Sequence, residues 1–283
     1  MTATRRVDPQ LYTKEYYLQA CTGYATFTSS HGSILEPRLA MVAEFAPSWH
    51  NQRVLDIGCG RGELVFHAAR HGARFAVGID YSPDSIAISQ DARTHQPQTI
   101  KKKTRFFTAD AKELPFAASS FDYIFFTEVW EHVYPEEVDA ILAEMHRILT
   151  PSGKLIIHTA PTRTFNNYSY PLWCYPMSSL LVWFYKLLTG KSYPNILPPK
   201  DIRGTYELEM HVNETTHFSV YRQLTRHGFN CSLFSTNQTV NKPILSWKDT
   251  LFNFIVYLSP LSRYFPFNLI WGNDIFAVAH KKA

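Results

Sequence analysis

The sequence has few cysteines, no long apolar run and no strong excess of charge of either sign. Its four cysteines form no C-x-x-C pair and no metal-ligand spacing, so we expect a reduced, cytoplasmic protein. The 28 basic and 24 acidic residues leave a net charge of +4, which argues against a nucleic-acid partner. The aromatic segments stay below the roughly 18 uninterrupted apolar residues of a membrane span. No apolar stretch follows Met1–Arg6, so a secretory signal is not expected.

Between residues 53 and 158, short apolar strands alternate with helices. The expected strands are Arg53–Ile57, Phe75–Ile79, Thr104–Thr108, Tyr123–Thr127 and Lys154–His158. The expected helices between them are Glu63–His71, Pro83–Ala92 and Glu136–Leu149. Further along, the sequence predicts a helix over Thr216–Arg226 and strands over Phe229–Phe234 and Asp274–His280. This alternation predicts an α/β fold with a parallel sheet covered by helices on both faces.

The rest of the chain departs from this alternation. We expect residues 1–48 to form an N-terminal helical cap with a break near Gly32. Residues 49–283 then form one domain, interrupted by two aromatic-rich insertions at about 161–212 and 240–271. A chain of 283 residues is long enough to bury a sizeable core in such an elaborated domain.

The most informative stretch is the run Val54–Gly62, in which an apolar strand leads into D-x-G-x-G-x-G. Glycine allows a backbone to pass close to a bound ligand, because it has no Cβ. The acid of the motif, Asp56, would repel a pyrophosphate but would favour a cationic group. The third glycine also comes one residue too early for the dehydrogenase pattern G-x-G-x-x-G.

This loop resembles the first motif of the class I S-adenosylmethionine-dependent methyltransferases. Later segments resemble the same family in the same order, among them Leu114-Pro115-Phe116 and Arg147–Leu155. The resemblance implies a Rossmann-like, doubly wound sheet of seven strands in the order 3-2-1-4-5-7-6, the last antiparallel. It also implies that Asp80 accepts hydrogen bonds from ribose and that Asp110 takes the adenine amino group. The cofactor-binding residues that we expect are Asp56, Gly58, Cys59, Gly60, Asp80, Tyr81, Asp110, Ala111, Thr127 and Tyr16.

The segment after the fourth strand carries the candidate catalytic groups. If it is helical, Glu128, Glu131 and His132 share one face. This E-x-x-E-H pattern resembles the ubiquinone-pathway O-methyltransferases and the small-RNA 3′-terminal 2′-O-methyltransferases, the latter with a divalent metal. Two later histidines, His211 and His217, could complete such a site, and we chose Glu128, Glu131, His132 and His217 as its ligands. The alternatives to a metal site are that His132, with Glu131, acts as a base without a metal, or that these residues have only a structural role.

The cap and the insertions leave several interpretations open. In similar enzymes an N-terminal helix folds over the cofactor, so Tyr16 or Tyr17 could touch it. The aromatic insertions could pack on each other, bind a long apolar acceptor, lie in a membrane interface or form a dimer contact. The oligomeric state is left open.

We therefore expect an S-adenosylmethionine-dependent methyltransferase that acts on an oxygen of a small-molecule or lipid-like acceptor. The alternatives are a metal-dependent RNA 2′-O-methyltransferase, a nicotinamide-dependent oxidoreductase and a cofactor-binding protein without catalysis. Mild charge with no basic stripe opposes the RNA alternative.

Overall fold

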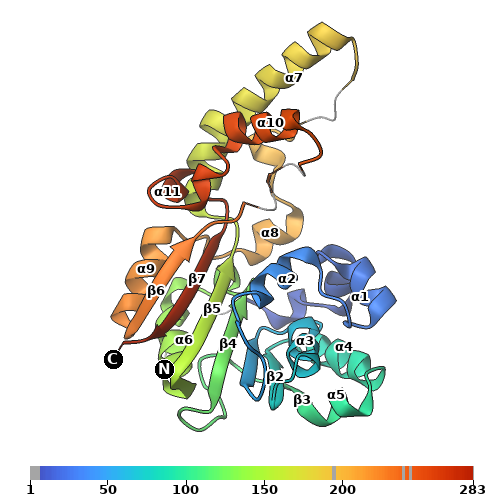
Figure 1. Ribbon diagram of the computed structural model, residues 1–283, viewed down its shortest axis with the longest axis vertical. Coiled ribbons are helices and arrows are strands. Elements are labelled where there is room, and N and C mark those ends of the chain that lie inside the picture. The colour runs from blue at the N-terminus through green and yellow to red at the C-terminus, as the bar shows by residue number, and fades with distance from the viewer. Residues whose placement is uncertain (1–6, 193–195, 238–239, 242–243, 283) are drawn as a thin grey trace.

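A seven-stranded sheet in the order β3-β2-β1-β4-β5-β7-β6 forms the centre of the computed structural model (Figure 1). The structure describes residues 7–192, 196–237, 240–241 and 244–282. The strands are β1 (Arg53–Ile57), β2 (Phe75–Asp80), β3 (Thr104–Thr108), β4 (Phe121–Thr127), β5 (Leu149–Thr159), β6 (Phe229–Phe234) and β7 (Ile275–Lys281). The predicted strand order is confirmed, as is the antiparallel pairing of the last strand, β7, with β5.

Helices cover both faces of the sheet, which explains why its central strands are apolar on both sides. On one face lie α3 (Glu63–Arg70), α4 (Pro83–Thr94) and α5 (Gln98–Lys103), whose apolar side chains join the core around Phe125 and Ile156. On the other face, α6 (Pro135–Ile148) and α9 (His217–Arg226) join the core around Leu55 and Ile124. These two side chains occupy paired positions on β1 and β4.

Two local predictions were wrong. The strand expected to begin at Lys154 begins at Leu149 and contains an irregularity, on either side of which Leu149 pairs with Phe121 and Lys154 pairs with Tyr123. The short helix α5 was not expected, since its sequence offers one buried apolar residue, Ile100, and no amphipathic pattern.

The expected helical cap consists of four short elements. They are η1 (Pro9–Leu11), η2 (Tyr16–Ala20), α1 (Tyr24–Ser30) and α2 (Pro37–Ala43). The buried Arg61 side chain of the glycine loop donates to the carbonyl oxygens of Tyr17 (3.1 Å) and Thr22 (2.7 Å). These bonds hold η2 and the turn after it against the loop.

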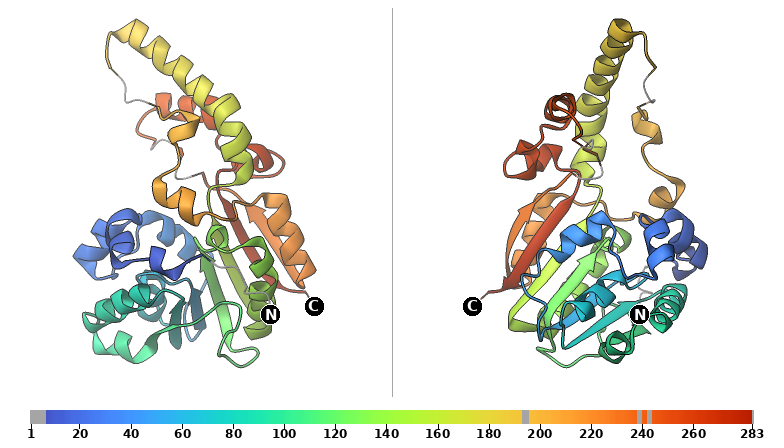
Figure 2. Two further views of the ribbon diagram at one scale, coloured as in Figure 1. Left: turned by 180° about the vertical axis from the view of Figure 1, so that it is seen from behind. Right: turned by 45° about the vertical axis from the view of Figure 1, so that its right-hand side comes forward.

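The two insertions lie together at one end of the molecule. The first contains η4 (Phe165–Cys174), which continues into α7 (Tyr175–Thr189), followed by η5 (Pro199–Asp201) and α8 (Thr205–Met210). The second contains α10 (Trp247–Tyr257), η6 (Leu261–Arg263) and α11 (Asn268–Trp271). We call η4, α7, α10, η6 and α11 the aromatic subdomain. Phe165, Cys174 and Val256 form its small core, and both views in Figure 2 show α7 extending beyond it.

None of the helices in the described ranges combines the length and the apolar character that crossing a bilayer requires.

Candidate active site

A cavity of about 790 Å³ lies at the carboxyl ends of β1, β2 and β4. Open α/β sheets bind ligands at this edge, where the strand order reverses. The cap contributes Tyr12, Tyr16 and Tyr17 to the lining, and the aromatic subdomain contributes Phe165, Tyr170 and Tyr257. The cavity therefore joins the glycine loop to both segments that interrupt the regular fold.

The glycines of the loop make room for the protein itself. Gly58 has a φ of +72°, and a Cβ added there would overlap the Val129 side chain. Gly62 has a φ of +87°, and its Cβ would lie 2.7 Å from the Phe106 ring. At these two positions the neighbouring side chain already requires glycine, in addition to the close ligand that the sequence argument invoked.

Three successive amides of the loop, those of residues 58–60, are occupied within the protein. The N–H groups of Gly58 and Cys59 donate to the carbonyl oxygen of Ile79 at 2.8 and 2.9 Å. The N–H of Gly60 donates to the Asp80 carboxylate at 3.0 Å. A phosphate site uses free N–H groups, and the N–H groups of Gly58, Cys59 and Gly60 are not free.

Asp56 supplies the complementary feature, an unused acceptor. The residue is only 3% exposed, and its Oδ1 has no hydrogen-bond partner among the described residues. Burial, followed by the charges of Glu63 and Asp80, raises its pKa well above the usual range. A buried acceptor without a donor is costly, so this oxygen fits a ligand that brings a donor or a positive charge, such as an ammonium group.

The other expected cofactor residues fall into two groups. Cys59, Tyr81, Thr127 and Tyr16 line the cavity together with Asp56, Gly58, Gly60 and Asp80. Asp110 and Ala111 are not among the lining residues. The Asp110 carboxylate instead accepts from the Lys112 backbone N–H at 2.9 Å and pairs with its Nζ at 3.3 Å. The expected adenine contact at this position stays a prediction.

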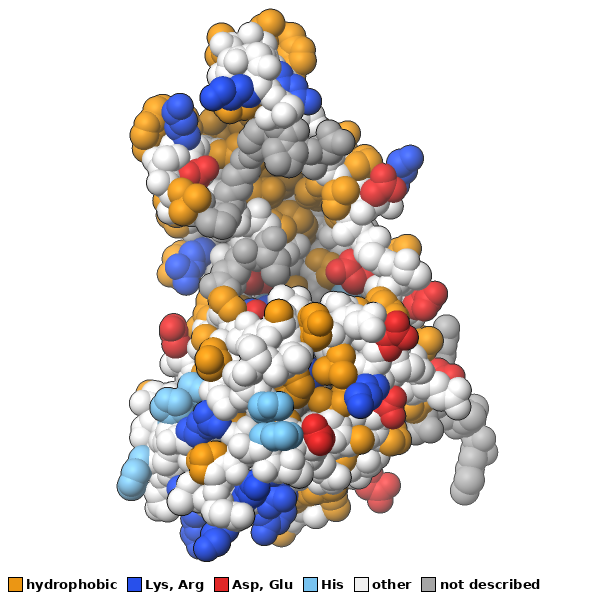
Figure 3. All heavy atoms as spheres, turned by 90° about the vertical axis from the view of Figure 1, so that its right-hand side faces the viewer, with side chains coloured by type: hydrophobic (Ala, Val, Ile, Leu, Met, Phe, Trp, Pro, Cys, Tyr) orange, Lys and Arg blue, Asp and Glu red, His pale blue; other side chains and the backbone are white. Residues whose placement is uncertain are grey.

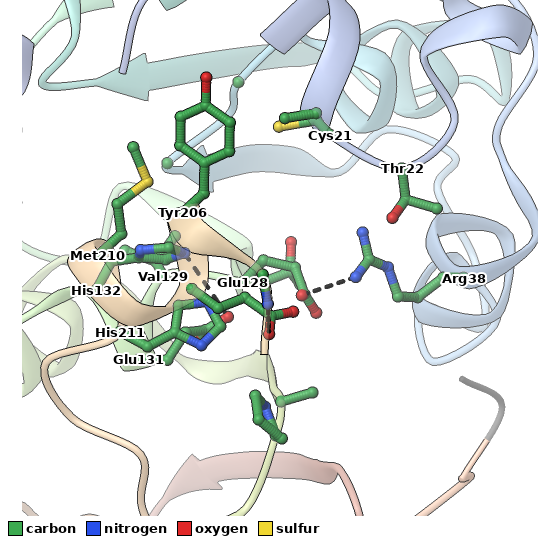
Figure 4. Close-up of a pocket in the computed structure, with 18 of the residues that line it drawn as sticks. Cys21, Thr22, Arg38, Glu128, Val129, Glu131, His132, Tyr206, Met210 and His211 are labelled. Atoms are coloured by element: carbon green, nitrogen blue, oxygen red, sulfur yellow. Dashed lines mark hydrogen bonds and ion pairs between the residues drawn. The ribbon is translucent and has the colours of Figure 1, made fainter. Parts of the chain in front are cut away.

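The segment after β4 is not the α-helix that we expected. Glu128 has a φ of +56°, and only Trp130–His132 (η3) forms a single 3-10 turn. The Glu128 carboxylate pairs with Arg38 at 2.8 Å (Figure 4). It also forms an ion pair with His158. Arg38 belongs to the cap, and no motif pointed to it.

Glu131 and His132 meet a third residue, His211, in the cavity wall. One ligand atom from each lies within 4.8 Å of the others. Glu131 is 1% exposed and accepts from the Thr159 hydroxyl at 2.7 Å. His217 lies elsewhere, with its Nε2 bonded to the Ser235 hydroxyl at 2.8 Å. Of the four ligands chosen from the sequence, Glu128 and His217 are outside this group, whereas His211, the other histidine considered, belongs to it.

The two glutamates of this segment have opposite electrostatic surroundings. Burial alone would raise the pKa of Glu128, but the charges of Arg38 and His158 lower it to about 2. Burial, followed by the charge of Glu128, raises the pKa of Glu131 to about 8. The site thus combines an ionised carboxylate held by cations with a carboxyl group that is protonated at neutral pH.

Two histidines near these glutamates, His132 and His158, also have pKa values shifted in opposite directions. Burial, followed by the neighbouring His211, lowers the pKa of His132 to about 3. Burial would also lower the pKa of His158, but Glu128 and Asp274 raise it to about 9. At neutral pH, His132 is a neutral imidazole, which is the form that binds a metal, and a pKa this low also makes it a weak base.

Comparison with known proteins agrees with this architecture. Residues 55–157 match a family described as "Methyltransferase domain". Over 111 residues, or 39% of the chain, the sequence is 32% identical to norajmaline N-methyltransferase of Rauvolfia serpentina and covers 37% of that protein. Over 181 residues, or 61% of the chain, it is 26% identical to cyclopropane-fatty-acyl-phospholipid synthase of Escherichia coli strain K12, covering 43% of it. In both cases the chain spans less than half of the relative's length.

A solved structure shares the fold. The crystal structure of an S-adenosylmethionine-dependent methyltransferase from Mesorhizobium loti aligns with a TM-score of 0.53 at 18% identity. The alignment covers 86% of this chain and 96% of that one. The family match identifies residues 55–157 as a methyltransferase domain, and the confirmed strand order is that of the Rossmann-like methyltransferase fold.

Proposed function

We propose that the protein transfers the methyl group of S-adenosylmethionine to an oxygen atom of a lipid-like or small-molecule acceptor. The observation that carries this proposal is one cavity with two unlike ends. The end at the glycine loop presents the buried carboxylates of Asp56 and Asp80, and the other end is lined by aromatic side chains of the subdomain. The first end suits a cationic nucleoside and the second an apolar acceptor.

The cofactor supplies a methyl group that its sulfonium already activates. In our proposal, Asp56 Oδ1 accepts from the ammonium group, and Asp80 accepts from the ribose hydroxyls. The cap and the subdomain exclude water and hold the acceptor oxygen in line with the methyl group, which is catalysis by proximity.

An acceptor hydroxyl must also lose a proton, and His132 is placed to take it. Its Nδ1 lies 2.9 Å from the Tyr12 hydroxyl, which fixes the plane of the ring. In our proposal Nδ1 carries the proton of this bond, and Nε2 takes the proton of the acceptor. Glu131 lies next to this nitrogen, with its Oε1 4.0 Å from Nε2. The name of one relative specifies N-methylation, so the choice of oxygen is tested separately.

The same side chains could instead hold a divalent cation. Glu131, His132 and His211 offer one carboxylate and two imidazoles, a donor set suited to such an ion. A bound cation would lower the pKa of the acceptor oxygen in place of a base. Dialysis against a chelator separates the two versions. Unchanged turnover would support the base, and a loss that Mg²⁺ or Mn²⁺ restores would support the cation.

Cofactor binding has a matched test. In calorimetry with S-adenosylhomocysteine, we expect Asp56→Asn to weaken binding at least tenfold, since a hydrogen bond to a charged group contributes about 1.5–3 kcal/mol. Asp139→Asn, at an exposed position on α6 outside the cavity lining, should leave the affinity unchanged. The absence of binding to the unmodified protein, or equal effects of both variants, would contradict the proposal.

The acceptor can be found with a labelled methyl group. We expect label from S-adenosylmethionine to appear in the organic phase of a cell extract, with an oxygen-bound methyl by mass spectrometry. Label in RNA or on nitrogen would correct the acceptor class. The compartment that we propose is the cytoplasm, since Cys21, Cys59, Cys174 and Cys231 are all free thiols.

A further inference from the structure

The outer part of α7 is apolar and exposed around most of its circumference. The exposed side chains are Leu180, Trp183, Phe184, Tyr185, Leu187 and Leu188, with exposed fractions between 39% and 80%. At 3.6 residues per turn, these positions span more than half of the helix surface. A helix that packs on a protein usually needs a narrower apolar stripe. The rest of the described chain does not cover this surface.

The second insertion adds exposed apolar side chains beside α7. Leu245 is 90% exposed and Trp247, the first residue of α10, is 70% exposed. Val256 of α10 packs in the small core that also receives Leu181 of α7. The two helices are therefore held together as one unit, and Figure 3 shows hydrophobic and basic side chains gathered at this end of the molecule.

The charge of this end has one sign along α7. From residue 164 to residue 199 the sequence contains no Asp or Glu, and its only charged residues are Lys186 and Lys191. Lysine beside exposed Trp, Tyr and Leu is the composition of a membrane interface. Basic residues at such a surface are attracted to anionic headgroups.

We propose that α7, with the start of α10, inserts into the surface of a bilayer that contains anionic lipids. Lipid surrounds a projecting helix, whereas a protein partner covers one of its sides, and the exposed apolar side chains of α7 span more than half of its surface. A second copy would also bring Lys186 and Lys191 toward the same two lysines, with no carboxylate from α7 to pair them. Charge complementarity thus favours anionic lipid as the occupant.

The position of the subdomain connects this surface to the cavity. Three side chains of the subdomain line the cavity: Phe165 and Tyr170 of η4 and Tyr257 of α10. The segment η4 continues directly into α7, and Tyr257 ends the helix that Trp247 begins. A lipid-like acceptor could pass from the bilayer into the cavity between them. This second step depends on the proposed function, whereas the docking of the helix does not.

The test is vesicle flotation with the full chain and no cofactor. We expect the protein to float with vesicles of phosphatidylglycerol and phosphatidylcholine, and less with phosphatidylcholine alone. Leu187→Asp/Leu188→Asp should lower the partition coefficient at least roughly a hundredfold, because two leucine side chains no longer enter the bilayer. The matched control, Ile34→Asp/Phe218→Asp, changes two side chains that are 60% and 67% exposed on the cap and on α9. It should float like the unmodified protein.

Two further measurements test the role of the lysines and the folding of the leucine variant. Lys186→Gln/Lys191→Gln should remove the preference for anionic vesicles. Unchanged S-adenosylhomocysteine binding by Leu187→Asp/Leu188→Asp would show that this variant is folded and would separate docking from the proposed function. The proposal is overturned if the unmodified protein does not float, or if Leu187→Asp/Leu188→Asp floats equally well. It is also overturned if sedimentation finds a dimer without vesicles that this variant dissociates, because α7 would then join two copies.

Discussion

The hydroxyl of Tyr12 lies 2.9 Å from Nδ1 of His132, so the N-terminal cap contacts the candidate catalytic residue directly. The two residues are 120 positions apart, and Tyr12 is only 5% exposed. Burial raises the pKa of its hydroxyl above the usual range, with further increases from neighbouring tyrosines, so the phenol stays protonated. The cap therefore contributes to the geometry of the site as well as covering it.

We expect Tyr12→Phe to lower kcat about tenfold or more, because the His132 ring loses the bond that orients it for proton transfer. The affinity for S-adenosylhomocysteine should change little. Steady-state kinetics with calorimetry would separate the two effects. Tyr221→Phe, at a position that is 51% exposed on α9, is the control. Equal kcat values for the two variants would mean that Tyr12 only packs.

Arg61 provides a test of how the cap is held. Its side chain is 6% exposed, bonds two carbonyl oxygens of the cap and pairs with the buried Glu63 at 2.9 Å. Arg61→Ala leaves that carboxylate without its cation, so we expect a loss of about 3–5 kcal/mol in the free energy of unfolding. Urea denaturation measures this loss, and limited proteolysis should cut first within the cap.

The control for Arg61 is Arg53→Ala. Arg53 pairs with Asp122 at 2.8 Å, but both side chains are partly exposed. Such a pair contributes about 0–1 kcal/mol. A loss for Arg61→Ala no larger than that for Arg53→Ala, with the cap equally resistant to protease, would mean that Arg61 does not anchor the cap.

His158 predicts a pH dependence of stability. Its ring lies between the carboxylates of Glu128 and Asp274 and against the Phe276 ring. Because the folded-state pKa, about 9, exceeds the ordinary value of 6.5, the stabilisation is complete below pH 6.5 and is lost as the pH rises through 9. The difference corresponds to about 3 kcal/mol. Urea denaturation between pH 6 and 9.5 should record this decline for the unmodified protein and a flatter curve for His158→Gln. Parallel curves would rule out the ion pairs as the cause.

The sequence predicted the sheet well and the candidate site less well, for physical reasons. Strands such as β3 and β6 are short segments in which phenylalanine and other apolar residues stand among polar ones, and their bounds were predicted correctly. The conformation of Glu128 was not predictable, since its positive φ belongs to a turn in which its N–H donates to the carbonyl oxygen of His158 at 2.9 Å. His211 could not be preferred over His217, because that choice depends on how the first insertion folds back.

The glycine loop offers the last prediction. A Cβ at Gly58 would overlap Val129, and its φ of +72° is a region that other residues adopt at a cost. We expect Gly58→Ala to lower the melting temperature and to weaken S-adenosylhomocysteine binding by displacing the segment that carries Glu131 and His132. Adding Val129→Ala should recover part of both losses, because it removes the methyl groups that the new Cβ meets. Thermal unfolding and calorimetry measure the two quantities.

Gly190→Ala is the matched control for the strain that a positive φ imposes on alanine. Its φ is +63°, but no atom lies within 4 Å of where its Cβ would be. Gly190→Ala should therefore cost about 1 kcal/mol, the strain of the left-handed conformation alone, with unchanged ligand binding. If Gly58→Ala behaves like Gly190→Ala, the contact with Val129 does not matter. If Val129→Ala recovers nothing, the loop needs glycine for its conformation and not for the space that the neighbouring side chain occupies.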